Sequence, residues 1–145
     1  MRKLILAISA LALAGTAAFA DPIADRKALM KANGKAAGAL SAIVKGEQPF
    51  DAAAVLAALT TLSENASKID VAALFPAGSD KGDTTASPKI WENTADFQAR
   101  VDKLKTDTAA AVAAPPADVD SLKATLGTIG NNCGGCHENF RIKKG

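Results

Sequence analysis

The sequence has no tyrosine, one tryptophan, one histidine and two cysteines in 145 residues. A structural zinc site takes four cysteine, histidine or carboxylate ligands, and this chain offers only three soft or imidazole ligands, so we do not predict zinc. No run of lysine or arginine is interleaved with aromatic residues, which disfavours nucleic-acid binding. Alternation of β-branched residues is scarce, which argues against strands.

The first 20 residues have the pattern of a secretory signal peptide. Two basic residues, Arg2 and Lys3, precede an apolar run over residues 4–14, and residues 18–20 (Ala-Phe-Ala) form a small-residue cleavage site. The apolar run is too short to span a bilayer comfortably, so we predict a cleaved signal peptide rather than a transmembrane anchor. The mature chain, residues 21–145, is then exported to the periplasm and is long enough for one domain with one core.

The charge balance of the mature chain gives no indication of a polyanionic partner. Loss of Arg2 and Lys3 leaves 15 of the 17 basic residues, which equal the 15 acidic ones, so the formal net charge is zero. We therefore predict no nucleic-acid partner, and we predict no transmembrane segment in the mature form.

Four segments repeat apolar residues at three- and four-residue spacing, which predicts helices. The first covers about residues 23–44, and the polar Asn33 weakens its first half. Its expected inward face comprises Arg26, Met30, Ala37, Leu40 and Val44. The second segment begins after Asp51, a good N-cap. Its apolar face comprises Val55, Leu59, Leu62, Ala66 and Ile69.

A loop and two further helices complete the prediction. Residues 75–87 are rich in turn-forming residues and predict the longest irregular stretch. The third helix opens at Ser87-Pro88 and stops at Pro115-Pro116. The fourth begins near Asp118 or Asp120, and its stripe comprises Val119, Leu122, Leu126, Ile129, Cys133, Cys136 and Phe140. Four amphipathic helices with mostly short connections predict an all-α antiparallel four-helix bundle, whose interior can hold a cofactor.

The two cysteines and the single histidine lie together near the C-terminus. The pentapeptide that begins at Cys133 reads Cys-Gly-Gly-Cys-His and matches the C-x-x-C-H motif of covalent haem attachment. At about 100° per residue, Cys133, Cys136 and His137 point into one sector of a helix. Two thioether bonds can then hold the haem edge while His137 reaches the iron, and the two glycines leave room for a flat ring. The motif predicts one haem c per chain.

Two other uses of the cysteines compete with haem attachment. A thioredoxin-like redox pair needs a βαβ context, and no strand pattern is present. A structural disulfide between Cys133 and Cys136 remains open in an oxidising compartment, although it leaves His137 unexplained. A haem-free dithiol–disulfide protein is therefore an alternative function.

Further haem contacts could come from the first helix and from the C-terminal tail. Met30 is the only methionine of the mature chain, and a thioether is an established partner of histidine on haem iron. Methionine more often fills a gap in a core, and periodicity alone leaves both roles open. Arg26, one turn earlier, is either a haem propionate contact or a solvated surface residue. Arg141, four residues after His137, is either a contact on the proximal side or a solubilising charge.

The position of the C-x-x-C-H motif, on the last of four predicted helices, resembles the class II c-type cytochromes. These include cytochrome c′ and its low-spin relative, cytochrome c556. The resemblance spans essentially the whole mature chain and is strongest over residues 133–141, Cys-Gly-Gly-Cys-His-Glu-Asn-Phe-Arg. Arg26 with Met30, residues 45–51 and residues 88–91 are similar to that family as well.

This resemblance implies a bundle with haem buried near one end, thioethers to Cys133 and Cys136, and His137 as the proximal iron ligand. In cytochrome c′, the position four residues after the first-helix arginine holds a non-ligating residue, and the five-coordinate iron binds nitric oxide or carbon monoxide. In the c556 type that position is the methionine ligand, and Met30 occupies it here. The resemblance thus implies a low-spin, His/Met-ligated electron carrier, with a gas-binding cytochrome c′ as the alternative.

The function predicted from the sequence is electron transfer to an unidentified periplasmic redox partner. No acid, base or nucleophile is placed to act on a substrate, so we predict no enzymatic turnover. The chain is expected to be a monomer or a homodimer.

Overall fold

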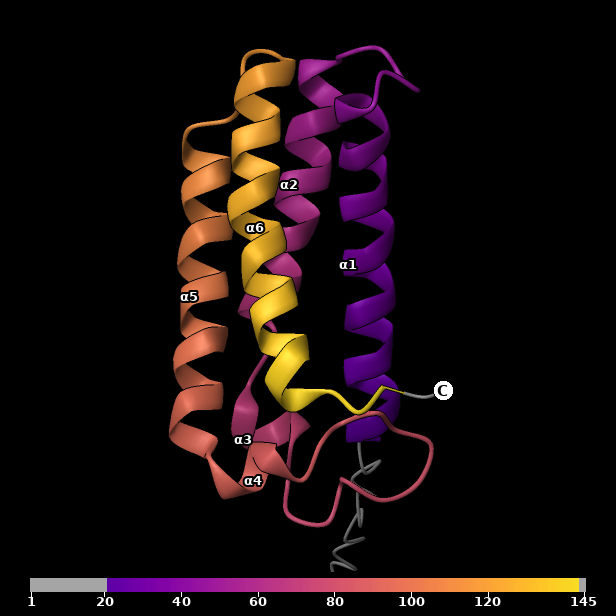
Figure 1. Cartoon of the computed structure of the whole chain (residues 1–145), viewed down its shortest axis with the longest axis vertical. Coiled ribbons are helices and arrows are strands. Elements are labelled where there is room, and N and C mark those ends of the chain that lie inside the picture. The colour runs from indigo at the N-terminus through magenta and orange to yellow at the C-terminus, as the bar shows by residue number, and fades with distance from the viewer. Residues whose placement is uncertain (1–20, 144–145) are drawn as a thin grey trace, which may run out of the picture.

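The computed structural model describes residues 21–143, so the predicted signal peptide and residues 144–145 lie outside the described residues. Within that range the chain forms an antiparallel four-helix bundle, as Figure 1 shows, which confirms the predicted fold class. Its long helices are α1 (Pro22–Val44), α2 (Ala52–Ser67), α5 (Thr94–Ala113) and α6 (Val119–Phe140), and its short helices are α3 (Val71–Leu74) and α4 (Lys89–Glu92). None of these helices is long and apolar enough to cross a membrane.

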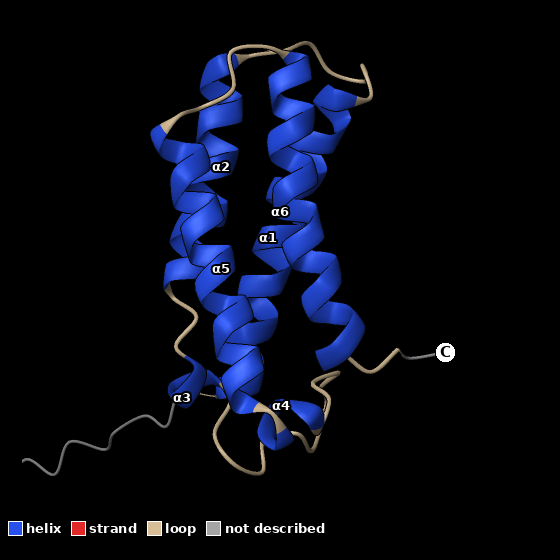
Figure 2. Ribbon diagram, turned by 60° about the vertical axis from the view of Figure 1, so that its left-hand side comes forward, coloured by secondary structure: helices blue, strands red, loops and turns tan. Residues whose placement is uncertain are grey.

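The four long helices form a ring in which α1 packs against α2 and α6, and α5 packs against the same two helices. Because neighbouring helices run in opposite directions, the N-terminal end of α1 and the C-terminal end of α6 lie at the same end of the bundle (Figure 1). The short helices α3 and α4 lie at this end too (Figures 1 and 2). This end therefore gathers the residues that the sequence predicts to bind haem.

Side chains that accept backbone N–H groups define where the helices begin. The Asp51 carboxylate accepts from Ala54 N at 2.8 Å, which confirms the predicted cap of α2. At the start of α6, Asp118 accepts from Ser121 N at 2.8 Å, and the Ser121 hydroxyl accepts from Asp118 N at 3.2 Å. Asp118, rather than Asp120, is thus the N-cap of α6, because this reciprocal pair satisfies two otherwise unpaired donors.

The buried apolar side chains form two clusters along the bundle. The first cluster comprises Ala36, Leu40, Ile43, Val55, Leu59, Leu62, Ala111, Leu122 and Ile129. The second cluster lies at the end that holds α3 and α4 and comprises Ile69, Val71, Leu74, Ala86, Ile90, Phe97, Val101 and Phe140. The predicted apolar face of the second segment is confirmed, since all five of its residues are buried.

The inward face of α1 is shifted by about one residue from the predicted face. The buried residues of α1 are Arg26, Ala36, Leu40 and Ile43. Met30, predicted on the inward face, is 39% exposed, while its neighbour Leu29 packs against the second cluster. The predicted and observed faces still share Arg26 and Leu40, because residues three and four apart lie on the same side of a helix.

The third predicted helix is interrupted soon after it begins. Asn93 has φ −137° and ψ 54°, so the chain leaves the helical conformation between α4 and α5. The sequence did not predict α3, whose N-cap is Asp70. The predicted irregular stretch is confirmed, and it occupies residues 75–88 between α3 and α4. We call this segment the α3–α4 loop.

Two leucines on α2 test the assignment of the first cluster. Leu59 is fully buried and Leu56 is 39% exposed. Leu59→Ala should lower the free energy of unfolding by about 2–5 kcal/mol, because it leaves a cavity in the core. Leu56→Ala on the same helix should change that free energy by less than about 0.5 kcal/mol. Urea unfolding followed by circular dichroism measures both, and equal losses would contradict the assignment.

Candidate haem-binding site

Helix α6 runs without interruption through both cysteines and the histidine. Successive residues of an α-helix are about 100° apart, so Cys133, Cys136 and His137 are directed into one sector of α6. Both cysteines are free thiols rather than partners in a disulfide. A regular helix therefore presents two thiols and one imidazole to the same side.

The two cysteines lie at the seam between the core clusters. Cys133 packs against the first cluster and Cys136 packs against the second. Both side chains are half-buried, and burial raises the pKa of each thiol above its usual value. The nearby charge of Arg100 partly offsets that rise in the pKa of Cys136. The thiols thus lie against apolar surroundings on both sides.

The two glycines between the cysteines have different surroundings. A Cβ atom added at Gly134 would meet no other atom within 4 Å. At Gly135 it would meet only the Arg100 Nη1 atom, at 3.4 Å. The backbone of α6 is therefore open to close approach at Gly134, whereas the Arg100 guanidinium lies against Gly135.

His137 is an exposed side chain whose chemistry suits metal ligation. Burial of part of the ring lowers the pKa of His137, and the charge of Arg141 lowers it further. A lowered pKa keeps the imidazole neutral at pH 7, and the neutral form is the one that binds metals. Arg141 follows at the C-cap of α6, where its backbone N–H donates to the His137 carbonyl oxygen at 3.2 Å.

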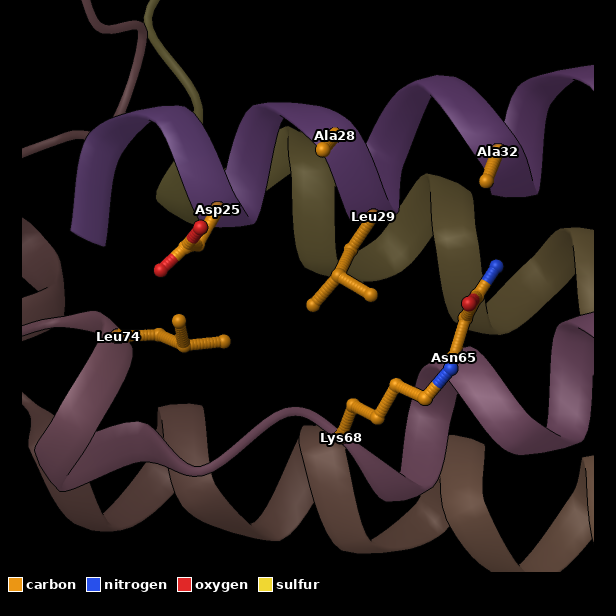
Figure 3. Close-up of a pocket in the computed structure, with 7 residues that line it drawn as sticks. All are labelled: Asp25, Ala28, Leu29, Ala32, Asn65, Lys68 and Leu74. Carbon is orange, nitrogen blue, oxygen red and sulfur yellow. The ribbon is translucent and has the colours of Figure 1, made fainter. Parts of the chain in front are cut away.

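Met30 lies on the side of α1 opposite a groove that α1 shares with α2 and α3. Ala28 and Ala32 line a groove of about 440 Å³ between α1, α2 and α3, which Leu29 and Asn65 also line, as Figure 3 shows. Met30 is roughly 160° around the helix from Ala28 and from Ala32, by the 100° spacing. Met30 is therefore directed away from this groove, and 39% of it is exposed. Met30 belongs to neither core cluster.

Arg26 is not a solvated surface residue, because only 5% of it is exposed. Its guanidinium donates from Nη1 to the Leu74 carbonyl oxygen at 3.0 Å and to the Ser79 hydroxyl at 2.9 Å. From Nη2 it donates to the Ser79 carbonyl oxygen and, at 2.7 Å, to the Thr84 hydroxyl. It also lies 5.0 Å from the centre of the Phe75 ring. The predicted propionate contact stays a prediction.

The α3–α4 loop that Arg26 binds is joined to the end of α6 as well. Ser87 N donates to the Phe140 carbonyl oxygen at 3.0 Å, and Ile142 N donates to the Thr85 carbonyl oxygen at 2.8 Å. Ala86 and Arg141 form an isolated antiparallel bridge at this junction. One loop therefore connects the helix that carries Met30 with the end of the helix that carries His137.

Arg100 is a residue of this region that the sequence did not single out. It reaches from α5 to α6, where its Nη1 donates to the Gly135 carbonyl oxygen at 3.0 Å. Its Nε donates to the Asp96 carboxylate at 3.1 Å, and the guanidinium lies 5.7 Å from the centre of the Phe140 ring. Its sequence position, three residues after the core residue Phe97, was the available signal, because it puts Arg100 beside the apolar stripe of α5.

Comparison with known proteins identifies the family. A family model described as Cytochrome C′ matches residues 21–141. The chain belongs to the cytochrome c′ family. Members of this family carry covalent haem c, so haem c is the cofactor of this chain. The alternative of a haem-free dithiol–disulfide protein is therefore wrong.

Relatives of two kinds are similar to this cytochrome. A cytochrome c-556 of Agrobacterium fabrum is 46% identical over 131 residues, which cover 90% of this chain and 88% of the relative. A cytochrome c′ of Rhodopseudomonas palustris is 42% identical over 150 residues, which cover 99% of both chains. The relatives therefore support a haem c cytochrome and leave its iron coordination to be proposed.

Solved structures of both kinds share the fold of this cytochrome. A cytochrome c′ structure from Rhodopseudomonas palustris has a TM-score of 0.79 and 43% identity, and the match covers 86% of this chain and 98% of that one. An NMR-validated structural model of oxidised cytochrome c556 from the same organism has a TM-score of 0.74 and 40% identity, with the same coverage. The bundle is therefore common to both kinds of protein and does not separate them.

The residues at this end of the bundle fit the cofactor that membership assigns. Two free thiols lie at the apolar seam between the core clusters, and the surface of α6 is open at Gly134. His137 and Met30, the two candidate iron ligands, are exposed and are not committed to core packing. Thiols, imidazole and thioether are the donor set that c-type cytochromes use.

Arg100 should stabilise the turn of α6 that carries the cysteines. Arg100→Met removes the hydrogen bond to Gly135 and should lower the free energy of unfolding of the holoprotein by about 1–2 kcal/mol. Lys103→Met, one turn further along α5, removes an ion pair with Asp107 in which the Lys103 side chain is 63% exposed, and should cost less than about 1 kcal/mol. Urea titrations followed by circular dichroism measure both, and an equally small loss for Arg100→Met would contradict this role.

Proposed function

We propose that this cytochrome is an electron carrier whose haem is attached through Cys133 and Cys136, with His137 and Met30 as the two iron ligands. The observation that carries the proposal is the position of Met30. It is the only methionine among the described residues, lies one turn after the buried Arg26, and belongs to α1, a helix that packs against α6. A large apolar side chain that is 39% exposed and packs in neither cluster is available as a ligand.

Each of the four residues has a separate task in this proposal. Cys133 and Cys136 fix the cofactor at the seam through two thioether bonds. His137 offers a neutral imidazole, and Met30 offers a thioether from the neighbouring helix. When bound, the haem supplies an iron that alternates between Fe(III) and Fe(II).

The ligand types explain why this arrangement suits electron transfer rather than catalysis. If His137 and Met30 both hold the iron in both oxidation states, little has to move when an electron enters or leaves. The Met30 sulfur favours the reduced state, as methionine does in other His/Met sites. The apolar surroundings at the seam of the clusters favour the same state, because they disfavour extra charge. We propose that the chain carries electrons and does not turn over a substrate.

A gas-binding cytochrome c′ is the competing function. The identities of 42% and 43% to proteins of that name favour it. In that case Met30 would stay unbound and exposed, and the open side of the iron would admit nitric oxide or carbon monoxide. The two functions differ in one bond, between the Met30 sulfur and the iron.

We further propose that the protein acts in the periplasm after cleavage behind Ala20. In support, Asp21 is the N-cap of α1, where its carboxylate accepts from Ile23 N at 3.0 Å and from Ala24 N at 3.1 Å. A mature chain that begins at Asp21 would keep this cap. The partner would be a periplasmic redox protein, met by a monomer or a homodimer of this cytochrome.

Substitution of Met30 tests the proposed ligand directly. Met30→Leu keeps the side-chain volume but removes the sulfur. Covalent haem should be retained, while the reduced iron should become high-spin and react with carbon monoxide, as visible absorption would show. Leu56→Ala is the control, because Leu56 has the same exposed fraction of 39% and lies on α2. If Met30→Leu has the spectrum of the unsubstituted protein, Met30 is not a ligand.

Substitution of the motif residues separates attachment from ligation. The double variant Cys133→Ser, Cys136→Ser should lose covalent haem, because serine cannot form the thioethers. His137→Ala should keep covalent haem but lose the low-spin spectrum, since the chain has no second histidine. Haem staining of a denaturing gel and visible spectra measure the two effects. Covalent haem in the double variant would refute attachment at these cysteines.

A further inference from the structure

The Arg26 side chain forms hydrogen bonds to residues that lie 48 to 58 positions away in the sequence. Its four hydrogen bonds reach Leu74 at the end of α3, Ser79 in the middle of the α3–α4 loop and Thr84 near the end of that loop. All the acceptors are carbonyl or hydroxyl oxygens, and Ser79 is itself 92% buried, with 8% exposed. One side chain on α1 thus holds the loop at its start, middle and end.

The far end of the same loop holds the end of α6. The backbone bonds of Thr85 to Ile142 and of Ser87 to Phe140 connect it to the residues that follow His137. Arg26 lies one turn before Met30 on α1. The contacts therefore form a continuous path from the turn of α1 that carries Met30, through the loop, to the end of α6.

We propose that Arg26 is a positioning residue that clamps the α3–α4 loop and thereby sets how Met30 on α1 meets the iron held by His137 on α6. This inference rests on the proposed function, because it assigns Arg26 a role in forming the bond between Met30 and the iron. Arginine suits this role because its planar group offers five donors in a fixed arrangement, whereas lysine offers three donors on one nitrogen.

The proposed clamp differs in a testable way from a direct contact between Arg26 and a haem propionate. A bidentate propionate contact would have to compete with four existing hydrogen bonds, which already use both terminal nitrogens of the guanidinium. Ser79→Ala removes a loop acceptor, the hydroxyl that receives Arg26 Nη1 at 2.9 Å, and leaves Arg26 unchanged. A clamp predicts that Ser79→Ala weakens the Met30 bond, whereas a propionate contact predicts no effect.

The experiment measures the fraction of reduced iron that reacts with carbon monoxide in the holoprotein. Arg26→Lys should raise this fraction several-fold above that of the unsubstituted protein, and Ser79→Ala should raise it in the same direction. Lys27→Met is the matched control. Lys27 also binds the loop, at Asp83, but through an ion pair whose side chains are 53% and 78% exposed, and such pairs contribute little. Leu59→Ala controls for general destabilisation and should leave the fraction unchanged.

Hydrogen exchange provides a second readout that does not depend on the iron. The amides of Ile142 and Ser87 report the junction of the loop with α6 and do not contact Arg26. Both should exchange about tenfold faster in Arg26→Lys than in the unsubstituted holoprotein, and Lys27→Met should leave them unchanged.

The two readouts separate failure of this inference from failure of the proposed function. If the unsubstituted reduced protein already reacts fully with carbon monoxide, Met30 is not a ligand and the role of Arg26 in that bond is overturned with it. If the unsubstituted protein resists carbon monoxide and Ser79→Ala is silent in both readouts, Met30 ligation stands and the clamp is overturned. Faster exchange together with a raised reactive fraction in both variants supports the clamp.

Discussion

The position of Cys133 and Cys136 at the seam between the two core clusters constrains the rest of the bundle. Each thiol packs against a different cluster, so a ring attached to both must enter between them. Helix α6 has to stay regular through this turn, because an irregular one would move His137 out of the sector that the thiols define. Arg100 braces the same turn from α5 at the Gly135 carbonyl oxygen. The proposed haem site thus depends on Cys133, Cys136 and His137 pointing to the same side of α6.

The parts of the fold that follow from local rules could be predicted from the sequence. The stripe of α2, its cap at Asp51 and the loop after Phe75 all agree with the structure, because helical periodicity and turn residues determine them locally. The common direction of Cys133, Cys136 and His137 could be predicted in the same way, since all three residues lie on one regular helix. These features needed no knowledge of distant residues.

The parts that depend on tertiary contacts could not be predicted. Met30 and Leu29 are adjacent, and only the packing of α1 against its neighbours decides which of them enters the core. The burial of Arg26 depends on acceptors that lie 48 to 58 residues away in the sequence, so spacing within α1 left it open whether the residue is solvated. Arg100 was missed for the same reason, because its partner Gly135 is 35 residues away.

We propose above all that Met30 is the second iron ligand, beside His137. The measurement that tests it most directly is the visible absorption spectrum of the reduced holoprotein, recorded with and without carbon monoxide. We expect a sharp, split low-spin spectrum that carbon monoxide leaves unchanged, because His137 and Met30 would both hold the iron. A broad reduced spectrum that shifts on addition of carbon monoxide would contradict it and would establish an open, gas-binding iron.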